Sequence, residues 1–133
     1  MTKYVIDASA AVEFLLRTDL GLKIGEIVED ALLVAPELVD VEVLSVLRRA
    51  VLGKKLQPVR ATLALGDLAT WQLARIPHLQ LLGEAWEQRN KVSAYDSFYV
   101  ATAQVFDAPL LTTDGPLSRA PALGILIHNV RLA

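Results

Sequence analysis

Two aspartates come after apolar stretches that have the composition of β-strands. Asp7 comes directly after residues 4–6. Asp114 comes just after residues 109–112, as the last residue of the segment LLTTD. The carboxyl ends of parallel strands meet at one edge of a sheet, and ligands of open α/β sheets bind in the crevice outside that edge. We therefore expect Asp7 and Asp114 to share one crevice. Each is also a favoured N-cap for the helix that follows it, and capping alone would explain its presence.

Glu42 interrupts the apolar helical stretch LVDVEVLSVL. When residues 37–52 are placed on a helix at about 100° per residue, apolar side chains cover nearly the whole circumference. We expect such a helix to be largely buried. Glu42, Ser45 and Arg49 form one narrow polar stripe on it. This stripe faces either a polar crevice or solvent, and an ion pair between Glu42 and Arg49 is a further alternative.

Asp96 is the acid of the segment SAYDSFYVATAQ, which otherwise has the small and apolar residues of a buried helix. Ser93 lies three residues before it, so the pair has the form of a capping box with Ser93 as the N-cap. An acid in the first turn also suits the helix macrodipole, which we expect to keep it ionised. Asp96 can take part in the cap and still direct its carboxylate into the crevice.

Several carboxylates in one crevice repel one another, so either some are protonated or a cation lies between them. The chain has no cysteine, and its two histidines, His78 and His128, are not clustered. All candidate ligands are therefore hard oxygens, which favour Mg²⁺ or Mn²⁺ over zinc or copper. Sites of this kind commonly act on phosphates, because the metal neutralises phosphate charge and activates water.

Strands and helices alternate along the chain and must bring these acids together. Apolar runs predict strands at residues 4–6, 32–35, 74–76, 109–112 and 124–127. Helical patterns occupy residues 8–17, 20–30, 37–52, 58–71, 79–89 and 94–106. Runs such as ALLVA and GILI are typical of parallel strands buried on both faces. The alternation predicts an α/β fold, a three-layer α/β/α sandwich with a central parallel sheet of about five strands.

Composition narrows the class of protein. We expect the 133 residues to form one domain, residues 1–133. Hydrophobic residues make up 53% of the chain, which predicts a well-filled core and some apolar surface for a partner. No apolar run approaches the roughly 18 residues of a membrane span, and the segment MTKYVIDASA lacks a signal-peptide pattern. We therefore expect a cytoplasmic protein with no membrane partner.

Four segments resemble those of the PIN-domain ribonucleases, namely VIDASAAVEFLL, APELVDVEVLSVLRR, SAYDSFYVATAQ and LLTTDGPL. Each segment is a weak motif alone, but all four in this order are specific. Within the family they look most like the VapC toxins of bacterial type II toxin–antitoxin pairs. The resemblance runs from the first strand to the last and implies the PIN-like sandwich of helices around a parallel sheet.

The resemblance implies an acidic quartet that binds Mg²⁺ or Mn²⁺ and hydrolyses RNA with water, leaving 5′-phosphate and 3′-hydroxyl ends. Some relatives carry Asn where this chain has Ser45, so position 45 is left outside the expected site. The quartet falls on Asp7, Glu42, Asp96 and Asp114, with Ser9, Thr112 and Thr113 as supporting polar residues. Candidates for contacts with the RNA backbone are Arg48, Arg49, Lys54 and Lys55.

The resemblance also implies partners. Family members usually form homodimers and are inhibited by a VapB-type antitoxin whose tail lies in a groove of the toxin. The apolar residues 12–16 and 38–52 fit such a groove for an amphipathic partner, or they simply fill the core.

Two other functions are kept as alternatives. The first alternative is a non-catalytic PIN-like module that binds RNA or protein. The second is a housekeeping PIN nuclease of RNA processing. A phosphatase of the haloacid dehalogenase type would require a second aspartate where Ser9 stands. A serine hydrolase would require a Gly-x-Ser-x-Gly turn, which the sequence lacks, and both histidines are expected to be structural or exposed.

Overall fold

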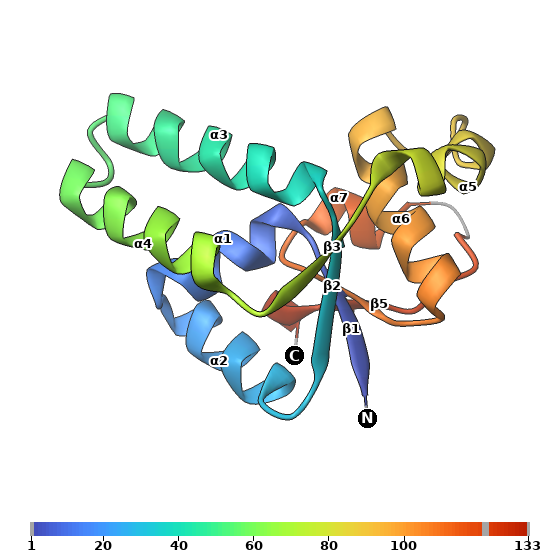
Figure 1. Cartoon of the computed structure of the whole chain (residues 1–133), viewed down its shortest axis with the longest axis horizontal. Coiled ribbons are helices and arrows are strands. Elements are labelled where there is room, and N and C mark those ends of the chain that lie inside the picture. Colours follow the sequence, from blue (N-terminus) through green and yellow to red (C-terminus); the bar gives the residue numbers. More distant parts are fainter. Residues whose placement is uncertain (1, 121–122, 133) are drawn as a thin grey trace.

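The centre of the fold is a five-stranded parallel sheet (Figure 1). The computed structural model describes residues 2–120 and 123–132. The strand order is β3-β2-β1-β4-β5, so the first strand lies in the middle. This arrangement confirms the predicted parallel α/β sandwich. The strands are β1 (Lys3–Ile6), β2 (Leu32–Pro36), β3 (Leu73–Ile76), β4 (Leu110–Thr112) and β5 (Ile127–Asn129).

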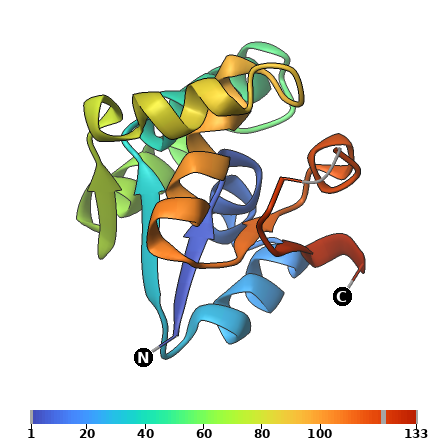
Figure 2. The same cartoon turned by 90° about the vertical axis from the view of Figure 1, so that its right-hand side faces the viewer.

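Helices cover both faces of the sheet. In Figures 1 and 2, α1 to α4 lie on one side, and α5 and α6 lie on the other. Within the described ranges, no helix is both long and apolar enough to cross a membrane. The helices are α1 (Ala8–Leu16), α2 (Asp19–Val28), α3 (Leu38–Leu52), α4 (Pro58–Thr70), α5 (Leu82–Glu87), α6 (Ala94–Phe106) and α7 (Gly115–Ser118), with 3₁₀ turns η1 (His78–Leu81) and η2 (Val130–Leu132).

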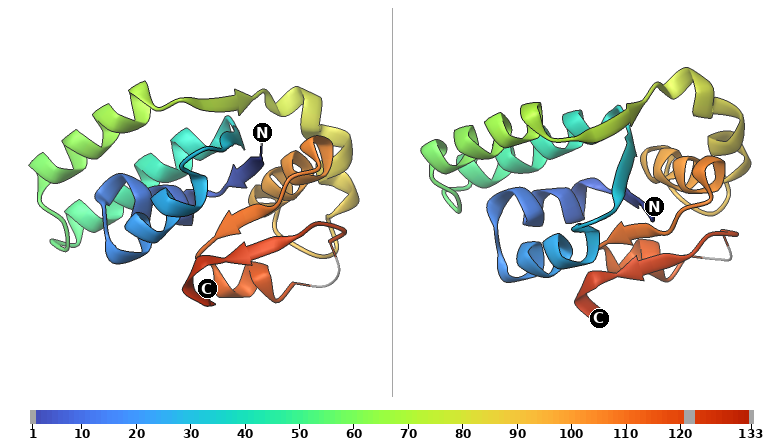
Figure 3. Two further views of the ribbon diagram at one scale, coloured as in Figure 1. Left: turned by 90° about the horizontal axis from the view of Figure 1, so that it is seen from below. Right: turned by 60° about the horizontal axis from the view of Figure 1, so that its bottom comes forward.

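The fifth strand lies farther along the chain than predicted. Residues 124–127 were expected, but β5 begins at Ile127, where it pairs with Leu110 of β4 at one edge of the sheet (Figure 3). Gly124 has a φ of 71°, in the left-handed region, which is incompatible with an extended strand. The helix predicted at residues 79–89 likewise divides into the turn η1 and the shorter helix α5.

The prediction that residues 37–52 form a largely buried helix is wrong. Only the face of α3 that carries Val39, Val43 and Leu47 is buried. The wheel is apolar all round, but a helix at the surface of a sandwich packs only one face against the core. The other face leaves large apolar side chains in solvent, with exposed fractions of 65% for Val41, 51% for Leu44 and 64% for Leu52.

Candidate acidic active site

The four predicted acids line one polar crevice at the carboxyl ends of the central strands. The crevice has a volume of about 240 Å³. Four separate elements supply its acids, because two of them cap helices that follow strands and two lie within α3 and α6. Its lining consists of Asp7, Ala8, Ser9, Glu42, Ser45, Val46, Arg49, Asp96, Tyr99 and Asp114.

Asp7 is both a helix cap and a member of the crevice. It is the N-cap of α1, and its Oδ1 accepts the backbone N–H of Ala10 at 3.0 Å. Oδ1 also accepts the Ser9 hydroxyl at 2.7 Å, and Oδ2 accepts the hydroxyl of Thr112. The residue is only 5% exposed. These contacts fix both carboxylate oxygens, so Asp7 is the most rigidly held acid of the site.

Asp114 has the same combination of roles at the end of β4. It is the N-cap of α7, and its carboxylate accepts the backbone N–H of Leu117 at 3.4 Å. Its own backbone N–H donates to the Thr112 hydroxyl oxygen at 2.9 Å. Thr112 therefore links Asp114 to Asp7. The capping explanation and the crevice explanation are both correct for these two aspartates.

The supporting polar residues hold the two ends of the strands together. Ser9 Oγ accepts the backbone N–H of Thr113 at 3.0 Å while its hydroxyl donates to Asp7. Thr112 is fully buried, and its hydroxyl donates to Asp7. Thr113 takes part through its backbone, and its carbonyl accepts the guanidinium of Arg131 at 3.1 Å. Ser9 and Thr112 thus orient Asp7 directly, and Thr113 contacts Ser9 through its backbone N–H.

Glu42 is held by a residue that the sequence analysis missed. The Tyr99 hydroxyl donates to Glu42 Oε1 at 2.6 Å, and Tyr99 is only 1% exposed. Burial, followed by the contact with Glu42, raises the pKa of Tyr99 far above its ordinary value, so the phenol stays protonated. One sequence signal was present: Tyr99 lies three residues after Asp96, a spacing that puts both on the same side of α6.

Asp96 lies in the first turn of α6, after the predicted N-cap. Ser93 Oγ accepts the backbone N–H of Asp96 at 3.1 Å, which is the N-cap bond of the predicted capping box. Burial raises the pKa of Asp96, and the charges of Asp114 and Glu42 raise it further. The helix N-terminus favours the charged form of Asp96, whereas burial and the neighbouring carboxylates act in the opposite direction.

Burial also raises the pKa of Asp7, to about 6. The hydrogen bonds from Thr112, Ala10 and Ser9 act in the opposite direction, and the charge of Asp114 adds to the rise. The carboxylates of this crevice thus disfavour one another's charge. A cation among them would relieve that repulsion.

The four acids offer the type of ligand atom that a hard divalent cation prefers. Asp7, Glu42, Asp96 and Asp114 offer only oxygen, and the crevice around them is polar. Among the residues that the structure describes, no three acids or histidines are close enough to form a ready-made metal cage. A cation would therefore have to draw the more exposed carboxylates inward, while Asp7 is already fixed.

The basic residues divide into two groups. Arg49 lines the crevice beside the acids, together with Ser45, which we had left outside the site. Arg48, Lys54 and Lys55 are exposed near the end of α3 and are not among the lining residues. The structure therefore brings only Arg49 of the predicted basic set to the acidic site.

The chain thus combines a parallel α/β sandwich with a crevice lined by four acids at the ends of the central strands. The model of the PIN domain matches residues 4–123. The chain is 37% identical to Ribonuclease VapC1 of Mycobacterium tuberculosis, over 98% of this chain and all of the relative. Ribonuclease VapC12 of the same species is 30% identical, over 87% of this chain and 90% of the relative.

Solved structures have the same fold. PAE2754 from Pyrobaculum aerophilum gives a TM-score of 0.67 at 22% identity, covering 98% of this chain and 93% of that chain. VapBC2 from Rickettsia felis, bound to a DNA fragment, gives a TM-score of 0.68 at 14% identity, covering 96% of this chain and 98% of that chain. The chain belongs to the PIN domain family, and its full-length similarity places it with the VapC ribonucleases, which confirms the resemblance.

Proposed function

We propose that this protein is an endoribonuclease of the VapC type, the toxin of a toxin–antitoxin pair, and that it hydrolyses RNA phosphodiester bonds in the acidic crevice. The observation that carries the proposal is the convergence of Asp7, Glu42, Asp96 and Asp114 from four elements on one crevice. The full-length similarity to proteins named ribonucleases supports the same chemistry. We place its action in the cytoplasm, where it would meet RNA.

The four carboxylates would hold Mg²⁺ or Mn²⁺. When bound, the ion neutralises phosphate charge and lowers the pKa of water. Asp7 would be the fixed ligand, because its oxygens are already oriented by Ser9, Ala10 and Thr112. Asp96, whose pKa is raised, is suited to accept a proton from the attacking water, with Asp114 as the alternative. Hydrolysis by water would leave 5′-phosphate and 3′-hydroxyl ends.

Cleavage of a mixed RNA pool tests this function. Purified protein is incubated with Mg²⁺, with Mn²⁺ and with EDTA, beside Asp7→Asn as the site variant and Asp30→Asn as an exposed control. We expect metal-dependent cleavage by the wild type and the control, and none in EDTA or by Asp7→Asn. Cleavage that survives in Asp7→Asn would point to a contaminant. Absence of cleavage by a wild type that binds metal and is free of antitoxin would favour the non-catalytic alternative.

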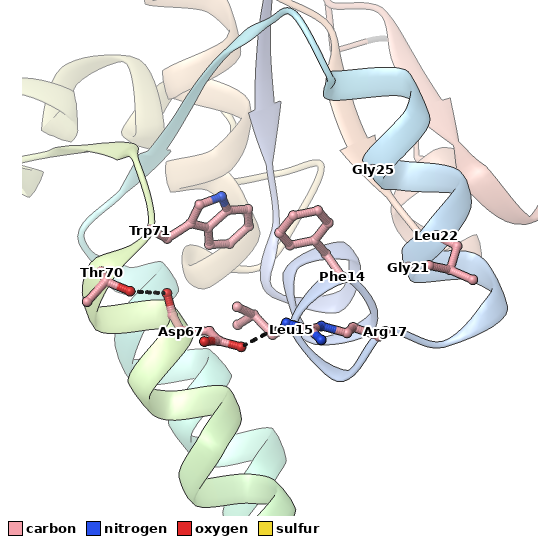
Figure 4. Close-up of a pocket in the computed structure, with 9 residues that line it drawn as sticks. All are labelled: Phe14, Leu15, Arg17, Gly21, Leu22, Gly25, Asp67, Thr70 and Trp71. Atoms are coloured by element: carbon pink, nitrogen blue, oxygen red, sulfur yellow. Dashed lines mark hydrogen bonds and ion pairs between the residues drawn. The ribbon is translucent and has the colours of Figure 1, made fainter.

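We propose a VapB-type antitoxin as the protein partner, with an apolar segment of it bound in a groove between α1, α2 and α4. Figure 4 shows this groove, in which Phe14 and Trp71 stack with their ring centroids 4.8 Å apart. Its volume is about 360 Å³. Leu22 is exposed at its side, and the ion pair between Arg17 and Asp67 lies at its rim.

The groove lies only partly where the sequence suggested. Phe14 and Leu15 come from the predicted residues 12–16, but no lining residue comes from α3. A neighbouring hollow shares Arg17 and Asp67 and continues past Leu63 of α4, so that an extended apolar segment can be accommodated. Co-purification with the antitoxin tests the surface. Leu22→Glu should abolish it, and Leu126→Glu, an exposed leucine elsewhere, should not.

We also propose a homodimer. The apolar face of α3, with Val41 and Leu44, is a surface that a second copy would cover. Light scattering of the purified protein measures the mass. A wild-type dimer that becomes a monomer in Val41→Glu would support this interface. A monomeric wild type would contradict the proposed homodimer.

A further inference from the structure

We propose that Tyr99 is a positioning residue for the metal site: its hydroxyl holds the Glu42 carboxylate in one orientation and leaves Oε2 to face the crevice. This inference rests on the proposed function. In it, a buried tyrosine orients one of the four acids that would bind the cation. The bond joins α6 to α3 across 57 positions of sequence.

The contact is short and lies at a buried side chain. The two oxygens are 2.6 Å apart, a distance typical of a hydrogen bond to an ionised acceptor. Tyr99 is almost fully buried, and its hydroxyl is the donor of this bond. Tyr99 lines the crevice together with both Glu42 and Asp96.

A buried tyrosine needs a hydrogen-bond partner in any protein, so packing alone would explain some acceptor at this place. It would not require that acceptor to be a carboxylate of the acidic crevice. Glu42, Asp96 and Asp114 line the same crevice, and carboxylates gathered in one crevice repel one another. A freely rotating Glu42 side chain would turn toward solvent under that repulsion. The Tyr99 hydroxyl opposes this rotation.

The same principle operates on the other side of the crevice. Ser9 and Thr112 donate hydroxyls to Asp7 and thereby fix its two oxygens. Tyr99 does for Glu42 what these residues do for Asp7. Partners that orient metal ligands in this way typically contribute about 10- to 100-fold to metal affinity or activity.

Binding of Mn²⁺, measured by calorimetry on protein stripped with EDTA and dialysed, tests the proposal. We expect Tyr99→Phe to bind Mn²⁺ about 10-fold more weakly than the wild type, because the ring stays but Glu42 is released. Thr102→Val is the matched control. It removes another fully buried hydroxyl of α6, one that bonds to the carbonyl of Phe98 within its own helix, and Mn²⁺ affinity should not change.

A double-variant cycle shows whether Tyr99 acts through Glu42. Glu42→Gln alone and Glu42→Gln with Tyr99→Phe should bind Mn²⁺ equally weakly, because the hydroxyl has no further ligand to orient. RNA cleavage should lose kcat in Tyr99→Phe with KM little changed. Independent, additive losses in the double variant would overturn the inference, as would wild-type Mn²⁺ affinity in a folded Tyr99→Phe protein.

The outcomes also separate this inference from the proposed function. Wild-type protein that binds Mn²⁺ but cleaves no RNA would defeat the nuclease proposal, while the affinities of the Tyr99 variants would still decide the positioning role. Wild-type protein that binds no Mn²⁺ would overturn the metal site and the positioning role together.

Discussion

The hydroxyl of Thr112 donates to the carboxylate of Asp7 across 105 positions of sequence. The bond connects the ends of β1 and β4, which are neighbours in the sheet with Ile6 paired to Leu111. Thr112 Oγ1 also accepts the backbone N–H of Asp114 at 2.9 Å. One buried hydroxyl therefore sets the relative positions of two of the four acids.

Replacement of Thr112 by valine should destabilise the fold. Valine has nearly the same shape, but it leaves the buried Asp7 Oδ2 without its donor and the Asp114 N–H without its acceptor. An unsatisfied buried polar group costs about 1–3 kcal/mol. Urea unfolding measures the change. Thr113→Val is the adjacent control, because Thr113 contacts Ser9 through its backbone N–H, which the substitution keeps, and we expect it to lose less stability than Thr112→Val. Equal losses in both variants would contradict the role of Thr112.

Asp7→Asn should stabilise the metal-free protein at neutral pH. Burial raises the pKa of Asp7 from 3.8 to about 6, so the folded state binds this proton more tightly than the unfolded chain does. The free energy of unfolding therefore falls as pH rises from about 4 to about 6. The shift corresponds to about 3 kcal/mol. The amide can keep the contacts to Ala10 and Ser9 without carrying charge.

Unfolding in EDTA at pH 4, 5, 6 and 7.5 tests this sign. The stability gain of Asp7→Asn should be largest at pH 7.5 and should shrink toward zero near pH 4. Asp30→Asn, which changes an exposed acid, should show no such trend. A variant that is less stable than the wild type at every pH would show that the charge of Asp7 is better accommodated than its burial indicates.

Asp7 and Asp114 could be placed from sequence because each follows a strand, and the ends of parallel strands meet by the geometry of the sheet. The contact between Tyr99 and Glu42 could not be predicted from sequence, since it depends on how α6 and α3 pack against one another. The fifth strand was misplaced for a related reason. The run GILI has strand composition, but pairing with β4 and the left-handed backbone of Gly124 decide where the strand begins.

His78 should stabilise the helix that carries Glu42. Its Nε2 accepts the backbone N–H of Leu38 at 2.8 Å, in the first turn of α3. The N-cap residue, Glu37, provides no side-chain hydrogen bond of its own. The imidazole, which also packs on Phe98, thus replaces an ordinary cap from a distant part of the chain.

We expect His78→Ala to lower the free energy of unfolding by about 1 kcal/mol, as the loss of an N-cap does. Amide hydrogen exchange should show faster exchange in the first turn of α3 than in α4. His128→Ala, in β5, provides the comparison, since any loss of stability there should leave the first turn of α3 protected. Unchanged exchange at Leu38 in His78→Ala would exclude the capping role.

Arg49 should contribute more to RNA cleavage than its neighbour Arg48. Both arginines are exposed, but only Arg49 is among the residues that line the crevice with the acids. A guanidinium beside the carboxylates can neutralise a phosphate that would otherwise be repelled from them. Truncation to alanine should therefore weaken RNA binding by about 10-fold for Arg49 and by less than about 3-fold for Arg48.

The salt dependence of RNA binding separates a direct phosphate contact from a loss of fold. If Arg49 contacts one phosphate, the slope of log affinity against log salt should become shallower by about 0.7 for single-stranded RNA in Arg49→Ala. Arg49→Lys keeps the charge and should retain the slope while losing part of the affinity, because the ammonium cannot donate in the forked geometry of a guanidinium. An Arg49→Ala protein with wild-type slope and affinity would place the phosphate contacts on the exposed Arg48, Lys54 and Lys55 instead.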